Sequence, residues 1–498
     1  MSKRAGALLL TALTIGVLGD QLLRPVPWGI GATIWIAVSA STALAWTRIT
    51  HPNRMPTLAT ILGTALFFAA CLAWRDAEQL KGWNVLAVLA VLTLGVLQMR
   101  GLRLRTGSAL DYVAGTAAAA VSTVAGAILL GQAAAPERNG PHTRTAGVLR
   151  GVLIGLLIAV PVILLFGALL LSADPVFETL VRQLFDWDFE QIVSHLLLVG
   201  FLSWIAAGYL HITAASDRRM FELHLPGRGP RLGLLEIGIP VGSVTLLFLA
   251  FVIIQVRYLF GGEELIRSVV DLTYAEYARR GFFELIAVSG LVLPLLLVAQ
   301  WAFEGREPNA ARIFRAMAVA QVVLVGMIMV SAVQRLKLYH DAYGLTESRF
   351  YAAAILAWIA LGLVWYAMTA LRGHRERFVF GVAVGGFLVV GVLNLMNPDA
   401  VIAQANLERA SAGRALDLDY LSRLSADATP TLVSSLSDLT TEDRCVVARK
   451  LAEERDHRRD RSWRSWSLGG SRADRAAADI DRVLRSCPAT ATVVAPDR

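Results

Sequence analysis

Charged residues are scarce in this chain: lysine, arginine, aspartate and glutamate together make up 17% of its 498 residues. A soluble globular domain carries about 25%, so the composition excludes a wholly water-soluble protein of this length. Recognisable catalytic signatures are also missing. No glycine-rich nucleotide-binding fingerprint, zinc-ligand spacing or G-x-S-x-G nucleophile elbow occurs in a fitting context. None of the eight histidines pairs with another at ligand spacing on an apolar stretch, so we predict no metal and no cofactor.

Long apolar stretches dominate instead, each close to the ~20 residues that a helix needs to cross a bilayer. In lipid every backbone polar group needs a partner within the protein, and a helix satisfies this within one segment. We therefore predict an all-α, polytopic membrane protein with about 12 transmembrane helices. The predicted spans are Ala5–Leu23, Trp28–Trp46, Pro56–Trp74, Trp83–Met99, Leu110–Gly131, Val148–Leu171, Ile192–Leu210, Leu235–Val256, Phe283–Ala302, Ile313–Val333, Phe350–Leu371 and Phe378–Met396.

Three regions follow from this pattern: N-terminal spans over residues 1–134, core spans over 135–400, and a soluble helical tail over 401–498. The run Met1–Gly19 resembles a signal sequence but has no A-x-A cleavage site, which favours a retained first span. In the tail, Thr440 followed by acidic residues predicts a helix start, and a second helix is predicted from Arg472 to Arg485. We expect a helical hairpin, broken at Gly469-Gly470 and covered by two tryptophans, Trp463 and Trp466.

Two of the three cysteines lie in this tail, at ends of the two predicted helices that an antiparallel hairpin brings together. A disulfide between Cys445 and Cys487 is therefore predicted, against the alternative of two unrelated buried thiols. Such a bond persists on the oxidising side of a membrane. Cys71 lies within a span, where a free thiol behaves as a small apolar residue.

Basic loops predict sidedness, because cytoplasmic loops collect lysine and arginine. Lys3 and Arg4, Arg48 and Arg54, and the cluster Arg100 to Arg105 place the N-terminus in the cytoplasm. The later clusters, Arg138 to Arg150, Arg218 to Arg231 and Arg372 to Arg377, fall on the opposite side if all twelve segments cross. Either one segment therefore fails to cross or one crossing is missing from these twelve, and Leu110–Gly131, rich in alanine, glycine, serine and threonine, is the suspect. We expect a multi-pass protein of a bacterial plasma membrane with an external tail. The arginines in its short loops indicate how the chain is oriented in the membrane, and they do not indicate nucleic-acid binding.

The loops after spans six, eight and ten and the segment after span twelve share one face by parity, and this face gathers unusual polar residues. Its candidate ligand-binding residues are Asp174, Tyr277, Arg280, Glu284, Arg335, Tyr339, Tyr343, Arg349 and Asp399. Charges near hydrocarbon depth cost at least ~2.5 kcal/mol and so face protein or water. The alternative for each residue is interfacial anchoring, with arginines extending to the headgroups and tyrosines lying among them. Asp20, one helical turn before Arg24, is more typical of such an interface than of a proton site.

Several of these segments resemble a family of bacterial multi-pass membrane proteins known only as a domain of unknown function, of the 4173 or 4153 type. The resemblance rests on Gly16 to Arg24, on Phe166 to Phe177, on Tyr258 to Gly262, on Leu338 to Arg349, and most specifically on Tyr274 to Leu285, YAEYARRGFFEL. It extends into the tail through Asn406 to Arg409 and Asp419 to Leu421. It implies a polytopic helical fold in a bacterial plasma membrane and supplies no catalytic residues.

Three functions remain open from the sequence. The favoured one is a non-enzymatic sensor, regulator or assembly factor whose tail and polar face contact a ligand or a protein partner. A secondary transporter fits the span count, but Pro161, Pro240 and Pro294 interrupt spans without the symmetric pairing of that class. A membrane-embedded enzyme acting on a lipid-linked or envelope substrate would use Asp174 or Glu284 as a general base. The chain has no recognisable catalytic set, so enzyme activity is the less favoured reading.

Overall fold

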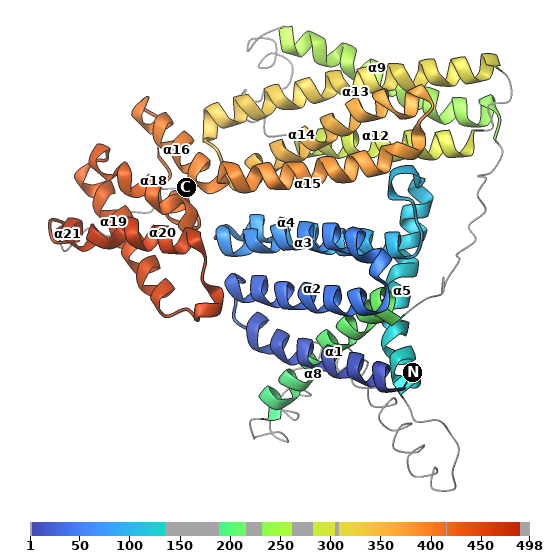
Figure 1. Cartoon of the computed structure of the whole chain (residues 1–498). Helices are drawn as coiled ribbons and strands as arrows, with labels where there is room; N and C mark the ends of the chain where they lie inside the picture. Colours follow the sequence, from blue (N-terminus) through green and yellow to red (C-terminus); the bar gives the residue numbers. More distant parts are fainter. Residues whose placement is uncertain are drawn as a thin grey trace, which may run out of the picture.

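The computed structural model describes residues 2–134, 189–215, 232–260, 282–303, 308–414 and 416–488, and these form an all-α protein (Figure 1). Eleven of the described helices are long and apolar enough to cross a membrane. They coincide with eleven of the twelve predicted spans. The remaining one, the sixth span Val148–Leu171, lies outside the described residues. The helices are α1 Ser2–Leu23, α2 Ile30–Thr50, α3 Met55–Trp74, α4 Glu78–Met99, α5 Ala109–Ala134, α8 Phe189–Leu210, α9 Leu234–Phe260, α12 Phe282–Ala302, α13 Pro308–Tyr343, α14 Glu347–Met368 and α15 Phe378–Met396.

Six of these helices, α1 to α5 and α8, form an N-terminal bundle around a common apolar core. Helix α8 comes after residue 134, the predicted end of the N-terminal region, and it packs against α1 and α5. Glycines permit the close approach. A Cβ at Gly16 of α1 would collide with Ser203 of α8, and one at Gly208 of α8 would collide with the backbone of Thr123 in α5. Small residues at such contacts are the usual means by which membrane helices associate.

A C-terminal bundle contains α9 and α12 to α15, which share a second core that includes Leu296, Val325 and Tyr366. Helix α13 has 36 residues, about 54 Å at 1.5 Å per residue. This exceeds the ~30 Å hydrocarbon thickness, so its last turns continue beyond the predicted span end at Val333. The two bundles meet where α4 contacts α15.

Helix α5 does not run along the others. Its first turns pack on Leu97 at the end of α4, and Ala127 and Leu130 near its end pack with Ala5 and Leu8 at the start of α1. The start of α1 and the end of α4 lie at the same end of the bundle, because α1 to α4 pack as successive antiparallel neighbours. Figure 1 shows α5 lying across the long axes of α2, α3 and α4. The segment suspected from loop charges therefore returns to the side from which it starts.

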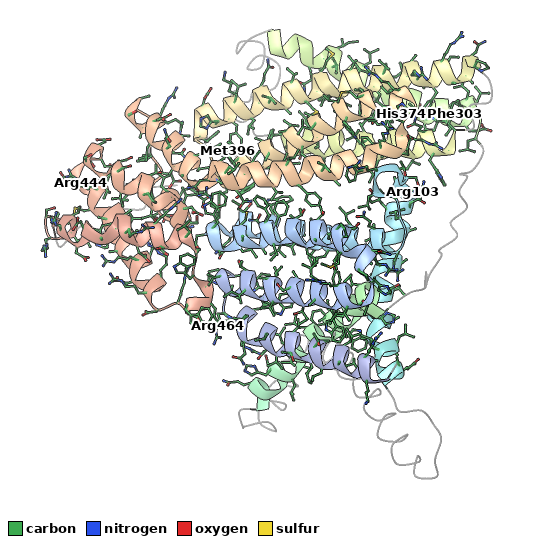
Figure 2. The ribbon with its side chains drawn as sticks, in the orientation of Figure 1. Arg103, Phe303, His374, Met396, Arg444 and Arg464 are labelled. Atoms are coloured by element: carbon green, nitrogen blue, oxygen red, sulfur yellow. A yellow bond between two sulfur atoms is a disulfide. The ribbon has the colours of Figure 1, made fainter. Side chains whose placement is uncertain are left out.

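This arrangement gives the membrane domain two distinct ends. We call one the basic end: it holds the turns at 48–54, 100–106 and 370–377, and Leu102 and Tyr112 pack there with Val379. The loops at 100–106 and 370–377 are thus neighbours. If all twelve predicted segments crossed, these two loops would lie on opposite sides of the membrane. The opposite tail end holds the turns at 24–29, 75–77 and 344–346 and the end of α15. Figure 2 shows Arg103, His374 and Phe303 at the basic end and Met396 and Arg464 at the tail end.

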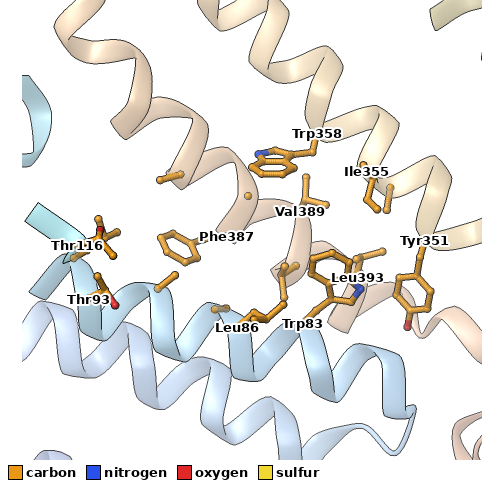
Figure 3. A pocket seen from close by; sticks show the side chains of 17 residues that line it. Trp83, Leu86, Thr93, Thr116, Tyr351, Ile355, Trp358, Phe387, Val389 and Leu393 are labelled. Carbon is orange, nitrogen blue, oxygen red and sulfur yellow. The ribbon is translucent and has the colours of Figure 1, made fainter. Parts of the chain in front are cut away.

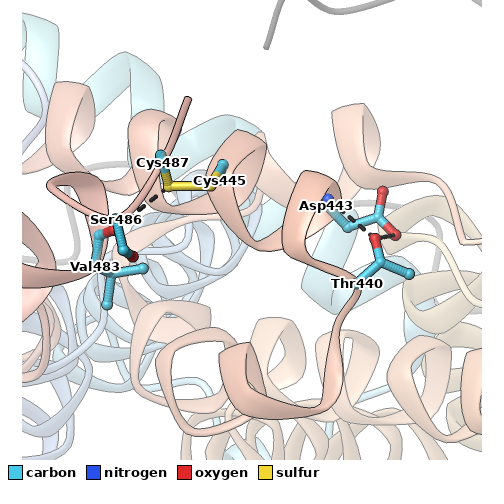
Figure 4. The surroundings of a disulfide bond; sticks show 6 residues. All are labelled: Thr440, Asp443, Cys445, Val483, Ser486 and Cys487. Atoms are coloured by element: carbon cyan, nitrogen blue, oxygen red, sulfur yellow. Dashed lines mark hydrogen bonds between the residues drawn. A yellow bond between two sulfur atoms is a disulfide. The ribbon is translucent and has the colours of Figure 1, made fainter. Parts of the chain in front are cut away.

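The tail packs as a helical domain on the tail end, with its own core around Ile402, Ala428, Ala448 and Leu451. Its helices are α16 Pro398–Ser411, α17 Leu418–Ser422, α18 Thr429–Ser434, α19 Thr441–Arg459, α20 Leu468–Ala476 and α21 Ile480–Leu484. Thr440 caps α19, accepting from the Asp443 amide at 3.2 Å (Figure 4). A disulfide joins Cys445 to Cys487, with Cα atoms 5.6 Å apart, and it connects α19 to the residues after α21.

Three details of the predicted hairpin are wrong. Gly469 and Gly470 do not break the chain; they lie in the first turn of α20, which Ser467 caps by accepting from the Gly470 amide at 3.0 Å. The second predicted helix is itself interrupted by the short 3-10 turn Ala477–Asp479. Trp463 and Trp466 do not cover the joint either. They are 61% and 44% exposed, because their segment lies against the start of α2, where Ile30 donates to the Trp466 carbonyl.

Candidate functional site

The predicted polar face is only partly brought together. Asp174, Tyr277 and Arg280 lie outside the described residues, and Glu284 is exposed at the start of α12. Arg335 is buried in α13.

Tyr339, Tyr343 and Arg349 do meet, at the turn between α13 and α14. The Arg349 guanidinium lies 3.7 Å from the centre of the Tyr339 ring, and Tyr339 contacts Tyr343 edge to face at 5.2 Å. Arg349 also donates to the Gly344 carbonyl. Gly344 has φ +81°, a backbone conformation that favours glycine. These contacts hold a tight turn.

Asp399 belongs to a different part of the tail end. It is fully buried in the first turn of α16, where one carboxylate oxygen accepts from the Ser425 amide at 3.0 Å. Its other oxygen has no hydrogen-bond partner. Burial raises the pKa of Asp399, and the negative charge of Asp76 adds to the effect. The carboxylate therefore carries an unsatisfied acceptor inside the protein, which is unusual and costly.

A network that the sequence analysis missed joins the tail to the membrane helices. We call it the junction network: Arg75 and Asp76 from the α3–α4 turn, Lys81 from the first turns of α4, and Asp427 and Ser467 from the tail. Asp427 accepts from the backbone amides of Asp76 at 2.5 Å and of Ala77 at 3.1 Å. Lys81 lies 3.0 Å from Asp76, and the Ser467 hydroxyl donates to Asp76 at 3.1 Å. All five side chains are buried.

Arg75 extends the junction network to the other bundle. It donates to the Asn394 carbonyl at the end of α15 at 2.7 Å, and it lies 3.8 Å from Asp427. One guanidinium thus contacts the C-terminal bundle and the tail from a turn of the N-terminal bundle. Gly469 makes room for this arrangement, because a Cβ there would collide with the Asp427 carboxylate.

The two carboxylates of the junction network differ in their electrostatics. Burial raises the pKa of Asp427, and the two backbone donors and Arg75 offset this only in part. Burial also opposes ionisation of Asp76, but the Lys81 ammonium, Arg461 and the Ser467 hydroxyl together hold its pKa below the usual range. The Asp76 carboxylate is therefore well compensated, whereas burial opposes ionisation of the Asp427 carboxylate more than its partners favour it.

Two further polar contacts lie nearby. Within the membrane domain, Asn84 of α4 and Asn394 of α15 exchange reciprocal amide hydrogen bonds of 3.0 and 2.8 Å, and both are fully buried. At the far side of the tail end, Asp20 contacts Arg24 at 2.7 Å and His195 of α8 at 2.5 Å. The sequence analysis considered Asp20 and Arg24 together. It could not predict the contact with His195, because His195 is distant from Asp20 along the chain.

An apolar groove runs between the two bundles (Figure 3), with a volume of about 450 Å³. The side chains that line it come mainly from α4, α14 and α15. Trp83 and Tyr351 lie at one end of the groove and Thr93 and Thr116 at the other. The Tyr351 hydroxyl is buried and has no hydrogen-bond partner. Its end of the groove is the tail end, next to the junction network.

Among the described residues, no group of three histidine, cysteine, aspartate or glutamate side chains is positioned to hold a metal ion. What the tail end offers is a set of buried, fixed charges that couple three parts of the chain, beside a groove of mainly apolar character. These features define an integral membrane protein with a docked helical domain.

The chain belongs to a family of unknown function: the family model DUF4153, Domain of unknown function, matches residues 62–435. This match decides between the two family types, 4173 and 4153, that the resemblance left open. The matched residues include the described helices from α4 to α18. Comparison with curated proteins and with solved structures gives no match.

Proposed function

We propose that this protein is a non-enzymatic sensor, regulator or assembly factor of a bacterial plasma membrane, in which the tail reports or sets the arrangement of the two bundles. The observation that carries the proposal is the junction network. Through it the tail contacts the N-terminal bundle at Asp76 and Ala77, and Arg75 reaches the C-terminal bundle at Asn394.

Further contacts on both bundles support this role. On the N-terminal bundle, the tail's Trp466 accepts from Ile30 at the start of α2 at 3.0 Å. On the C-terminal bundle, Asn406 of α16 bonds to both backbone groups of Leu345, and the Tyr420 hydroxyl accepts from the Glu347 amide at 2.8 Å. A relative movement of the bundles therefore changes the tail's own attachment points, which is the minimum that coupling between two sites requires.

The orientation is part of the proposal. With α5 returning to its starting side, the basic end gathers the arginines of three separate loops, and short loops rich in arginine are retained in the cytoplasm. The N-terminus then lies in the cytoplasm and the tail outside it. A disulfide between Cys445 and Cys487 fits the same assignment, because such bonds persist in oxidising compartments. The exposed surface of the tail is then available to a protein partner in the envelope.

The test is complementation of a chromosomal deletion by single variants. Asp427→Ala removes the tail's main acceptor for the α3–α4 turn, and we expect it to abolish complementation while the chain still inserts into the membrane fraction. Asp427→Asn keeps one acceptor oxygen and should restore part of the function. Asp438→Ala, on the exposed tail surface, is the matched control and should complement fully. Full complementation by Asp427→Ala would show that attachment of the tail is dispensable, and the proposal would fail.

A further inference from the structure

The groove between the bundles lies at the depth of the hydrocarbon layer. Its lining residues on α4, from Trp83 to Leu94, and on α15, from Ala383 to Leu393, all fall within membrane-spanning segments. The stretch from Trp83 to Leu94 covers about 16 Å at 1.5 Å per residue. A volume of about 450 Å³ is within the ~300–1,000 Å³ typical of small-molecule sites. An elongated apolar groove that runs parallel to membrane helices matches one hydrocarbon chain of a lipid.

One end of the groove is not apolar. Tyr351 is 4% exposed, and its hydroxyl, which has no hydrogen-bond partner, lies at the tail end among the lining side chains (Figure 3). Buried hydroxyls without a partner are rare in folded proteins, and each one requires an explanation. A polar group bound at this end of the groove would supply the missing partner.

The charges around Tyr351 indicate the sign of that group. Glu347 lies one helical turn before Tyr351 on α14, and Glu78 is the first residue of α4. Asp399 is buried at the start of α16, which packs against α14. Among the described residues, no lysine or arginine forms an ion pair with any of these three carboxylates, whereas Asp76 is paired with Lys81 and Asp427 with Arg75. The second oxygen of Asp399 is also an unsatisfied acceptor. This end of the groove therefore favours a cationic donor and disfavours an anion.

We propose that the groove binds one membrane lipid with a primary-amine headgroup, with a hydrocarbon chain between α4, α14 and α15 and the ammonium group at the end marked by Tyr351. The site stands on this geometry alone and does not depend on the regulatory function proposed above. The proposed lipid site is in contact with the junction network. Trp83 and Tyr351 belong to the same apolar cluster as Ala77, whose amide donates to Asp427.

The experiment measures lipid retained by the full chain. The purified protein is exposed to equimolar phosphatidylethanolamine and phosphatidylglycerol with identical acyl chains, and bound lipid is counted by native mass spectrometry. We expect one phosphatidylethanolamine per chain, preferred over phosphatidylglycerol by about tenfold, the effect of a single charge-assisted hydrogen bond. Equal retention of the two lipids, or retention of neither, would overturn the proposal.

Variants separate the groove from the surrounding lipid-facing surface. Ala383→Trp fills the groove from α15 and should abolish retention. Val384→Trp places the same side chain on the next residue, which is exposed and does not line the groove, and should retain lipid as the wild type does. Tyr351→Phe removes only the hydroxyl, so it keeps the fold and should lose the headgroup preference while a chain still binds. Unchanged preference in Tyr351→Phe, or unchanged retention in a folded Ala383→Trp, would each contradict the site.

Discussion

The basic end carries exposed arginines on its loops, whereas the tail end contains a buried arginine that contacts other parts of the chain. At the basic end, Arg103, Arg375 and Arg377 are exposed on short loops. At the tail end, Arg75 is buried and contacts both a tail carboxylate and the end of α15. Exposed arginines in loops interact with water and headgroups, and removing any one of them has little effect on the fold. Buried charges are held by specific partners, so each is a point at which the tail and the bundles depend on one another.

The largest expected effect is therefore at Asp427. Asp427→Ala leaves the buried Arg75 without its carboxylate and the two backbone amides of the α3–α4 turn without an acceptor, a loss of about 3–5 kcal/mol in the free energy of unfolding. Arg103→Ala at the basic end should change stability by less than about 0.5 kcal/mol. Thermal unfolding of the detergent-solubilised protein measures both. Similar shifts for the two variants would remove the distinction between the ends.

The asparagine pair should show the next largest effect. Asn84→Ala leaves the Asn394 amide buried without its partner, a cost of about 1–3 kcal/mol. Replacing both asparagines with alanine should cost less than the sum of the single changes, because neither partner is then left unsatisfied. The same unfolding measurement on the three variants tests this. Strict additivity would mean that the two amides do not stabilise the contact between α4 and α15.

Asp399 should give the tail end a distinctive pH dependence. Its folded-state pKa is raised by burial and by Asp76, so the folded state holds a proton that the unfolded state releases. Stability therefore falls as pH rises from the ordinary aspartate pKa through the raised value, by up to about 1.4 kcal/mol per pH unit.

Asp399→Asn cannot titrate and keeps an acceptor for Ser425. Unfolding temperatures of wild type and variant, measured from about pH 4 to pH 8, should therefore converge at the acid end and separate in favour of the variant at the neutral end. A constant difference across that range would show that Asp399 does not titrate as its burial requires.

The smallest effect is expected at the turn between α13 and α14. Tyr339→Leu removes the ring beneath the Arg349 guanidinium and should cost about 1 kcal/mol. Tyr343→Leu, at a 52% exposed ring, should cost less. If the exposed tyrosine proves the more important for thermal stability, the cation–π contact does not hold this turn.

Local physics explains why the sequence predicts the helices well. Apolar runs of bilayer length fold as helices in lipid, and eleven predicted spans coincide with described helices. The path of α5 is different, because length and composition are the same for a crossing helix and for one lying across the end of a bundle. Only the conflict in loop charges pointed to it. The extension of α13 past Val333 had no signal in hydropathy, because those turns are polar.

The candidate site was harder to predict, since its parts meet through tertiary contacts. Arg75, Asp76 and Lys81 lie between two predicted spans, a position typical of ordinary interfacial anchoring. Their partner, Asp427, is 350 residues from Ala77 along the chain, and nothing in its local sequence distinguishes it from a surface aspartate. Asp399 was selected for its place at the end of a span, but its neighbours differ from those expected on the polar face.

Sidedness underlies the whole comparison, and two engineered cysteines test it directly. Asp479 on the tail and His374 at the basic end both have well-exposed side chains, at 78% and 57%. The one native unpaired thiol among the described residues, Cys71, is buried. We expect a membrane-impermeant maleimide to label Asp479→Cys in intact cells and to label His374→Cys only after permeabilisation. Labelling of His374→Cys in intact cells, with Asp479→Cys protected, would contradict the account.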